Sequence, residues 1–351
     1  MRILIFGAGP LGSLFAAKLK QGGHDVALLA RGKREEDLRQ YGVVLKGWAT
    51  GEVTTTQLKI VSQLRPNDDY DIVFVLMRKN QAIEILPSLA ANKKIRSIVL
   101  LMNNAAGPQV FFDALGAERV LLGFPGAAGY FEDNTVVYVT ATYERPTNVI
   151  IGDVECSMKD NLQQVIHVLE KAPYFKVTIE KQMDSWLKYH VALLFPTLAP
   201  ALYLCNTNNY RMAKTPDAII LAIRGIRESF HVLRKLHFPM RPAYLRILTI
   251  IPEPLLVYLM EKLLDNPKME VAMVKHAKAA ESEVLHLMDE FMVLVRQSAL
   301  FTPTIQFLTA QYKKRALPLP EGSASLKPKW SEVFILFLVI ILFVLILITI
   351  F

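Results

Sequence analysis

Short apolar runs alternate with amphipathic segments over residues 1–122. Five runs are rich in apolar and β-branched residues, as in buried parallel strands: Arg2–Phe6, Asp25–Leu29, Asp71–Leu76, Ser97–Met102 and Val120–Gly123. Helical patterns over residues 11–21 and 82–91 lie between them. The alternation predicts an α/β domain with a Rossmann-type, doubly wound parallel sheet. Two later runs, Thr135–Thr142 and Asn148–Ile151, predict further strands that extend it, in an antiparallel sense.

From about Lys159 the spacing of apolar residues becomes helical. Helices are predicted over these ranges: Leu162–Lys171, from Met183 onward, Ala218–Leu236, Glu253–Leu264 and Lys268–Arg296. Pro196 and Pro200 must kink or break the second of them, because proline cannot continue a helical hydrogen-bond ladder. We therefore predict an α/β domain over residues 1–178 and an all-helical domain over residues 179–315.

The last residues form a separate apolar segment. Residues 316–332 are rich in Pro, Ser and Gly and predict a linker. Residues 333–351 carry no charge, and at roughly 1.5 Å per residue a helix of that length spans about 28 Å, close to a bilayer's hydrocarbon thickness. Lys327, Lys329 and Trp330 precede it, so a single-pass C-terminal transmembrane helix with the catalytic domains in the cytoplasm is expected. A buried terminal helix is the alternative.

Composition narrows the classes of function. The chain has 351 residues, a net charge of +8 and two cysteines, Cys156 and Cys205. Two cysteines predict no disulfide framework and no metal site. The positive charge suits an anionic cofactor and an anionic membrane surface, and no basic patch interleaved with aromatic residues suggests nucleic acid. The N-terminus begins directly with a strand, so no signal peptide is expected.

A glycine motif follows the first predicted strand. Gly7, Gly9 and Gly12, with Pro10 and Leu11 between the last two, form G-x-G-x-x-G at a strand-to-helix turn. In this context Gly7 allows the tight turn, Gly9 lets the backbone approach a pyrophosphate, and Gly12 lets the helix pack closely. The helix N-terminus would then face the phosphates. The motif predicts binding of a nicotinamide dinucleotide.

The end of the second predicted strand discriminates between NAD and NADP. Arg31, Lys33 and Arg34 follow it, and no carboxylate intervenes before Glu35. An acidic residue there would bind the ribose 2′-hydroxyl, whereas arginine accepts a 2′-phosphate. NADPH is favoured with Arg31 as the phosphate ligand, and a solvated basic loop is the alternative.

With these motifs the chain resembles the ketopantoate reductase (2-dehydropantoate 2-reductase) family over about residues 1–315, as a divergent member with a C-terminal membrane segment. The family has a lysine followed three residues later by glutamine, where this chain has Arg78 and Gln81. After the fourth strand the family has Asn-Gly-x-Gly, matched here by Asn104 and Gly107 with Ala105 at the first glycine. The resemblance implies that Arg78, Gln81 and Asn104 belong to the cofactor site.

The same resemblance implies where catalysis takes place. Trp186-Leu187-Lys188 matches the family's Trp-x-Lys motif, in which the lysine is the general acid. Glu283 matches a glutamate that hydrogen-bonds the substrate hydroxyl. A lysine ammonium would stabilise the charge that develops on a carbonyl oxygen and deliver a proton to it. His190 lies close to Lys188, but a histidine on an apolar helix is more often packed than catalytic.

The chain departs from the family at substrate-binding positions. Ala192 and Pro196 replace two asparagines, and by spacing Lys268 and Val271 replace an asparagine and a serine. A buried polar group left without a partner costs roughly 1–3 kcal/mol. We therefore expect an NADPH-dependent reductase of a 2-oxo acid, either ketopantoate in the pantothenate pathway or a more apolar analogue.

Two other functions stay open from the sequence. One is a membrane-tethered NADPH-binding sensor or scaffold without catalysis, which the lost asparagines favour. The other is a different dehydrogenase with the same two-domain plan, such as a 6-phosphogluconate dehydrogenase relative, against which the Trp-x-Lys placement argues. The oligomeric state is also open, a homodimer being one alternative.

Overall fold

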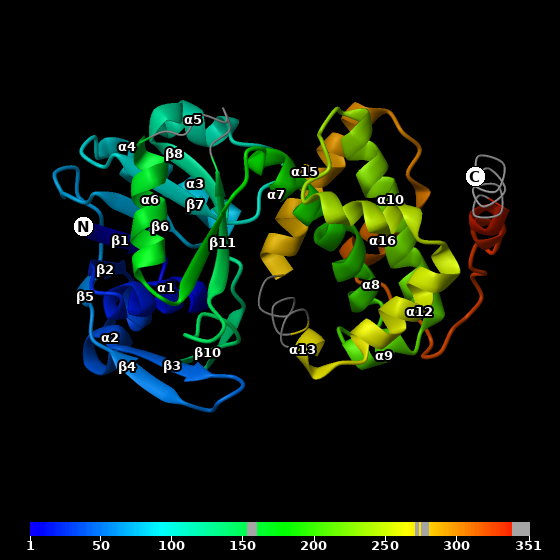
Figure 1. The fold of residues 1–351 in the computed structure, drawn as a ribbon, viewed down its shortest axis with the longest axis horizontal. Coiled ribbons are helices and arrows are strands. Elements are labelled where there is room, and N and C mark those ends of the chain that lie inside the picture. Colours follow the sequence, from blue (N-terminus) through cyan, green and yellow to red (C-terminus); the bar gives the residue numbers. More distant parts are fainter. Residues whose placement is uncertain (153–159, 271–273, 275–280, 339–351) are drawn as a thin grey trace, which may run out of the picture. The chain divides into compact units, whose positions relative to one another are not determined.

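The computed structural model describes residues 1–152, 160–270, 274 and 281–338. It divides into two compact units, Met1–Lys188 and Tyr189–Phe351, whose elements are labelled in Figure 1. The division falls inside a helix, later than the boundary at residue 178 that the sequence suggests. Lys188 is thereby grouped with the first unit.

The first unit is built on a sheet that the described residues form from eight strands. Their order across the sheet is β12-β11-β8-β7-β6-β1-β2-β5. Their bounds are β1 Arg2–Phe6, β2 Asp25–Leu29, β5 Lys59–Val61, β6 Ile72–Val75, β7 Ser97–Leu101, β8 Val120–Phe124, β11 Thr147–Gly152 and β12 Phe175–Ile179. All neighbours pair in parallel except β11 and β8, which are antiparallel. The five predicted parallel strands are confirmed, and the run Asn148–Ile151 extends the sheet as β11, antiparallel to β8 as predicted.

A smaller second sheet has no counterpart in the sequence prediction. Its strand order is β4-β3-β10-β9. The bounds are β3 Val43–Gly47, β4 Val53–Thr56, β9 Gly129–Glu132 and β10 Thr135–Tyr138. The predicted strand at Thr135–Thr142 is confirmed as β10, but it pairs with β3 and β9 instead of extending the main sheet.

Helices cover both faces of the main sheet (Figure 1). In chain order they are α1 Pro10–Gln21, α2 Gly32–Tyr41, α3 Lys79–Glu84, α4 Leu86–Ala91, α5 Gln109–Leu115 and α6 Asp160–Lys171, with a 3-10 turn, η1, at Ala117–Arg119. Alternate strand residues face opposite sides, so two apolar cores form: one contains α1 and α6, and the other contains α3, α4 and α5. The helix predicted over residues 82–91 is two helices that meet at Ile85.

The second unit is helical, as predicted. Its first helix, α7 (Met183–Leu193), begins in the first unit and runs into a π-helical turn, η2 (Leu194–Leu198), and α8 (Ala199–Tyr203). Pro196 lies in the π turn and Pro200 in the first turn of α8, so the predicted break is confirmed. The remaining elements are α9 Asn209–Ala213, α10 Pro216–Lys235, η3 Ala243–Arg246, α11 Ile247–Ile250, α12 Glu253–Leu264, α13 Pro267–Met269, α15 Glu281–Ser298 and α16 Pro303–Lys313. Of the helix predicted over Lys268–Arg296, residues 271–273 and 275–280 lie outside the described residues.

Residues 316–330, predicted as part of a linker, lie along the helical unit as a strap. The Leu319 amide donates to the Leu204 carbonyl at 2.8 Å, and the Leu326 amide donates to Asp217 Oδ1 at 2.7 Å. Arg211 donates to the Leu319 carbonyl at 2.6 Å. The composition of this segment predicts that its backbone polar groups face water. In the structure these groups form hydrogen bonds with the helical unit instead.

Charged side chains fasten the end of this strap beside α12. Glu253 is fully buried and accepts from Arg224 at 2.8 and 3.1 Å and from the Lys329 amide at 3.1 Å. Arg227 donates to both carboxylate oxygens of Glu332 at 2.9 Å. Burial favours the neutral form of Glu332, but the Glu253 amide and Arg227 outweigh it and lower the pKa of this carboxyl. The start of the terminal helix is thus fixed to the helical unit.

The described part of the chain contains no helix that combines the length and the apolar character needed to cross a bilayer. The predicted transmembrane helix over residues 333–351 is therefore not supported there. A helix over residues 331–338 contains its first residues, and residues 339–351 lie outside the described residues.

Replacing Arg224 by Met is expected to destabilise the helical unit by about 3–5 kcal/mol, because a fully buried Glu253 carboxylate loses its strongest partner. Urea unfolding followed by circular dichroism measures the change. Adding Glu253→Leu to the same chain removes the orphaned charge and should restore most of the loss. An unchanged unfolding midpoint for the single variant would contradict the assigned role of the pair.

Candidate active site

The glycine turn has the geometry that its sequence predicts. Gly7 has φ +116°, and a Cβ there would lie 2.5 Å from the Leu76 carbonyl oxygen. A Cβ at Gly12 would lie 1.8 Å from the Gly7 carbonyl oxygen, so only glycine lets α1 approach β1. A Cβ at Gly9 would meet no described heavy atom within 4 Å. The turn is therefore tightly packed at Gly7 and Gly12, whereas the space beside Gly9 is open. This arrangement fits the approach of a pyrophosphate.

Pro10 and Leu11 begin α1 directly after this turn, with Gly9 as the N-cap and no side chain capping the helix. The first turn carries no acidic residue. No carboxylate in this turn would therefore repel a phosphate that binds to the backbone N–H groups.

The three basic residues after β2 do different things. Arg31 is exposed at the N-terminus of α2. Lys33 contacts Asp37 at 3.0 Å, and this hydrogen bond raises its pKa. Arg34 folds back over the glycine turn, where it donates to the Ala8 carbonyl at 3.3 Å and to Ser13 Oγ at 3.1 Å.

Arg34 is also held from its other side. Its guanidinium lies 4.7 Å from the centre of the Phe131 ring, in a cation–π contact, and burial lowers its pKa. A half-buried arginine beside the glycine turn is as well placed as Arg31 for the adenosine end of a dinucleotide.

At the end of β6 the buried side chain is Lys79, one residue beyond Arg78. Arg78 is half-buried at the N-cap of α3, and Gln81 is exposed. Lys79 is 1% exposed and donates to Asn104 Oδ1 at 2.7 Å. The family motif in the sequence aligned Arg78 with the cofactor-binding lysine. In the structure, α3 begins at Lys79, and it is the Lys79 side chain that contacts Asn104.

Asn104 ties the loop after β7 together. Its Oδ1 also accepts from the Gly107 amide at 3.1 Å, and its Nδ2 donates to the Gly107 carbonyl at 2.9 Å. Asn104 is 1% exposed. Its side-chain hydrogen bonds therefore stabilise its own loop and hold the Lys79 ammonium.

Lys188 lies against that same loop. Its Nζ would be 3.2 Å from a Cβ built on Gly107, whose φ is +93°, so a side chain at Gly107 would displace the ammonium. The Lys188 side chain is 3% exposed and pairs with Asp184 one helical turn earlier. Trp186 and Leu187 pack into the core of the sheet unit, with the Trp186 ring 5.1 Å from that of Phe124.

Parallel strands bring these loops to one edge. The loops after β1, β6 and β7 all leave the carboxyl ends of neighbouring strands, and β1 is where the strand order reverses. Ligands of open α/β sheets bind outside the carboxyl ends at that reversal. Within the first unit, the glycine turn, the Lys79–Asn104 pair and Lys188 therefore share one edge of one sheet.

The other predicted site residues belong to the helical unit. Glu283 is buried in the first turn of α15, and His190 is half-buried on α7. Of the positions that departed from the family pattern, Ala192 is fully buried and Pro196 is buried in the π turn. Lys268 is exposed, and Val271 lies outside the described residues.

Three residues at this edge escaped the sequence prediction as site residues. Asp184 could have been found because it stands four residues before Lys188, the spacing of a helical ion pair. Arg34 was recognised as a basic residue after the second strand, but nothing in the sequence distinguished its position from that of Lys33. Lys79 had no signal, since its burial depends on where α3 begins.

Two substitutions in the glycine turn should separate folding from cofactor binding. Gly9→Ala meets open space and should leave the melting temperature unchanged, while the Kd for NADPH rises about tenfold or more because the methyl group occupies the approach of the phosphates. Gly12→Ala should destabilise the first unit by roughly 1–3 kcal/mol through overpacking. Calorimetry and NADPH fluorescence titration measure the two effects; equal loss of stability in both variants would refute the distinction.

Solved structures share the fold. D-mandelate dehydrogenase with NADH and anilino(oxo)acetate aligns with a TM-score of 0.73 and 16% identity, covering 90% of this chain and 98% of that one. A ketopantoate reductase structure from Ralstonia solanacearum MolK2 aligns with a TM-score of 0.72 and 15% identity, covering 89% and 97%. 2-Dehydropantoate 2-reductase from Geobacter metallireducens GS-15 aligns with a TM-score of 0.72 and 14% identity, covering 90% and 100%. At these identities the similarity is one of fold.

Sequence comparisons are more specific. A curated 2-dehydropantoate 2-reductase from Archaeoglobus fulgidus is 25% identical over 217 residues, which are 61% of this chain and 68% of the relative. Residues 3–154, which contain seven of the eight strands of the main sheet, match the family described as ketopantoate reductase PanE/ApbA. The protein is thus related to the enzymes of the ketopantoate reductase PanE/ApbA family, a family of oxidoreductases.

Proposed function

We propose that the protein reduces the carbonyl of a 2-oxo acid to the 2-hydroxy acid with NADPH. The observation that carries the proposal is the position of Lys188. A buried ammonium, paired with Asp184 and seated on the loop after β7, lies at the carboxyl edge of a sheet whose first turn is shaped for a dinucleotide.

The chain has a group for each end of the cofactor. The pyrophosphate would lie over Gly9 and the first turn of α1. Arg31 and Arg34 would bind the 2′-phosphate that distinguishes NADPH from NADH. Asn104, Arg78 and Gln81 would serve the nicotinamide end, with Lys79 holding Asn104 in place.

When bound, NADPH supplies the hydride. Lys188 then has two tasks: its positive charge draws the carbonyl oxygen toward it, and its proton passes to that oxygen as negative charge develops there. The products are the 2-hydroxy acid, the oxidised cofactor and a neutral lysine that takes a proton back from water. Asp184, which pairs with Lys188 one helical turn away, would fix the direction of its ammonium.

Glu283 is our second proposed catalytic residue. It comes from the helical unit, and its proposed task is to accept a hydrogen bond from the substrate hydroxyl as that hydroxyl forms. It is buried on α15.

The substrate we propose is more apolar than ketopantoate. Ala192 and Pro196, both buried, stand where polar substrate ligands are expected. Without those amides a polar side chain of the substrate would lose hydrogen bonds, whereas an alkyl or aryl group would lose none. The shared fold with D-mandelate dehydrogenase, solved with an aryl-substituted oxo acid, supports this choice.

We also propose that residues 333–351 attach the protein to a bilayer. The support is the uninterrupted absence of charge over the segment and the basic and aromatic residues before it. The exposed apolar side chains of Phe334 and Phe337, in the described part, fit a segment that is not covered by the protein itself.

Replacing Lys188 by Ala should lower kcat about 10²–10⁴-fold, because the proton donor is lost, while the Kd for NADPH stays within about twofold. Turnover is followed as NADPH absorbance with ketopantoate and with phenyl-substituted and long-chain 2-oxo acids. Lys93→Ala is the matched control, since this exposed lysine precedes β7 at the opposite edge of the sheet.

Two results would count against the proposed reaction. One is an alanine variant that keeps the turnover of the parent protein. The other is a parent protein that binds NADPH but reduces none of these oxo acids, which would favour a cofactor-binding sensor or scaffold. Faster turnover of ketopantoate than of the apolar acids would refute the substrate preference alone.

Removing both cationic ligands of the 2′-phosphate should change the cofactor preference. In Arg31→Ala/Arg34→Ala the KM for NADPH is expected to rise about 100-fold or more, since each of the two charge-assisted contacts contributes roughly 1.5–3 kcal/mol, while the KM for NADH is little changed. Lys33→Ala is the control because Lys33 is engaged with Asp37. A parallel rise in both constants would mean that the arginines support the fold of the turn and not the choice of cofactor.

A further inference from the structure

Three consecutive helical elements of the second unit, η3, α11 and α12, expose large apolar side chains to solvent. On η3 and α11 these residues recur every third position, and on α12 they recur at helical spacing, so each set forms a stripe. Their side chains are between 44% and 72% exposed. We name this surface the α11–α12 apolar face: Tyr244, Ile247, Ile250, Leu255, Tyr258, Leu259 and Leu263.

Such a surface calls for a partner. Monomeric soluble domains rarely expose this many large apolar residues on neighbouring elements, and where they do the surface usually contacts a protein or a membrane. Two of the seven residues are tyrosines, and Trp330 nearby in the strap is also exposed. Tyrosine and tryptophan are enriched at the level of lipid headgroups.

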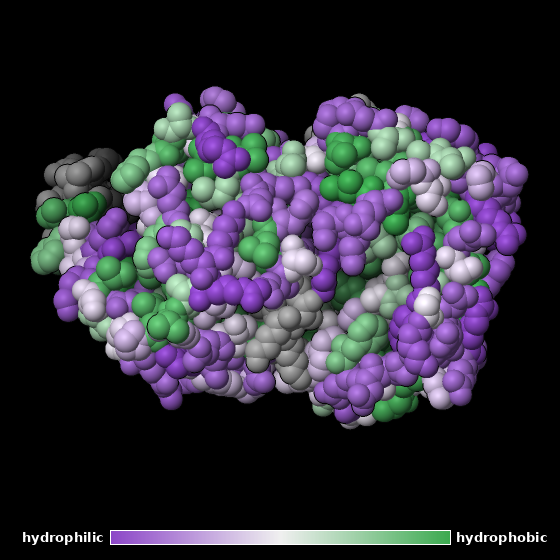
Figure 2. Space-filling view, turned by 180° about the vertical axis from the view of Figure 1, so that it is seen from behind, coloured by the Kyte–Doolittle hydropathy of each residue, from purple (hydrophilic) through white to green (hydrophobic). Residues whose placement is uncertain are grey.

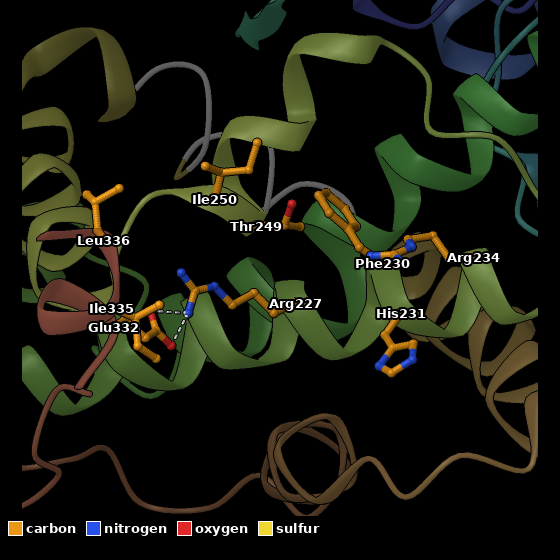
Figure 3. A pocket seen from close by; sticks show the side chains of 9 residues that line it. All are labelled: Arg227, Phe230, His231, Arg234, Thr249, Ile250, Glu332, Ile335 and Leu336. Atoms are coloured by element: carbon orange, nitrogen blue, oxygen red, sulfur yellow. Dashed lines mark hydrogen bonds and ion pairs between the residues drawn. The ribbon is translucent and has the colours of Figure 1, made fainter. Parts of the chain in front are cut away.

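Cationic hollows adjoin this face. One, of about 390 Å³, lies between α10, α11 and the helix over residues 331–338, as Figure 3 shows. The other, of about 480 Å³, lies beside it. Both are lined by Arg234, Thr249 and Ile250; His231 is in the first, and His237 and Arg246 are in the second.

Carboxylates are scarce in these hollows. Among the described residues that line them the only one is Glu332, and Arg227 neutralises it in the first hollow (Figure 3). Hollows with arginines at their walls and an apolar rim suit phosphate-bearing headgroups, because basic side chains near a membrane surface are attracted to anionic lipids.

The apolar terminal segment starts from the same place. Glu332 is held by Arg227 and by the Glu253 amide at the N-terminus of α12. Ile335 and Leu336 then line the first hollow opposite Thr249 and Ile250. The described apolar residues of this helix, Phe334 to Leu338, are exposed, and hydrophobic side chains are visible at that end of the helical unit in Figure 2.

From these observations we propose that the α11–α12 apolar face lies in the interfacial region of a lipid bilayer, with lipid phosphates in the hollows at Arg234 and Arg246. The proposal rests on the proposed attachment of residues 333–351, and it adds a second contact that orients the helical unit. The charge of the hollows and the start of the apolar segment beside them favour a bilayer over a second copy of this chain.

A fluorescent probe on this face tests the proposal in the full-length protein. Leu259→Cys, in a Cys156→Ser background, is labelled with an environment-sensitive fluorophore and reconstituted in phosphatidylcholine vesicles with and without phosphatidylserine. Cys205 is a buried free thiol whose burial raises its pKa to about 11, so it should resist labelling. Val293→Cys is the matched control: it is equally exposed but lines a separate hollow between α15 and α16.

Lipids brominated in their acyl chains should quench the Leu259 probe several-fold more than the Val293 probe. Arg234→Gln/Arg246→Gln should lower the affinity for vesicles that contain phosphatidylserine about tenfold, and have little effect on vesicles without it. Equal quenching at both positions overturns the proposal while leaving the attachment of the tail intact. Failure of the full chain to associate with vesicles overturns both. A Leu259 probe insensitive to bromine but altered when unlabelled protein is added assigns the face to a second copy.

Discussion

The contact on which the candidate site depends is the Asn104 side chain. Its oxygen accepts from Lys79 and from the Gly107 amide, and its nitrogen donates to the Gly107 carbonyl. A lysine that is 1% exposed must have such an acceptor, since a buried cation without one costs several kcal/mol. The amide thus satisfies Lys79 and at the same time closes the loop after β7 into the shape that receives Lys188.

The position of Lys188 is fixed within the sheet unit. Met183, Trp186 and Leu187 are part of its core, and Asp184 pairs with the lysine from the same helix. The first turns of α7 are therefore as much an element of the sheet domain as α1 is. A lysine held in this way keeps its distance from the strand ends whatever arrangement the helical unit adopts.

The sequence was sufficient to predict those elements of the fold whose burial produces a recognisable pattern of apolar residues. Uninterrupted apolar runs such as Arg2–Phe6 have to be buried strands, and the glycine spacing directly after that run is typical of a phosphate-binding turn. The small second sheet left no such trace: β4 is Val53–Thr56, mostly threonine, and β3 includes Lys46, so neither segment alternates clearly.

Side chains in the candidate site were harder to predict because register decides them. Arg78 and Lys79 are neighbours of equal charge, but α3 begins at Lys79, and successive helical residues point about 100° apart. Lys79 donates to Asn104 Oδ1. The strap over residues 316–330 eluded prediction for a similar reason, since its partners Leu204, Arg211 and Asp217 lie about a hundred residues away along the chain.

The strap has a mechanical consequence. A free peptide of fifteen residues would let its two ends wander about 20 Å apart. Hydrogen bonds along residues 316–330 remove that slack, so the helical unit and the first turns of the terminal helix tumble as a single body. The rotational correlation time of the helical unit would then be that of any larger body to which the terminal helix is bound. The same surface of the helical unit would always face that body.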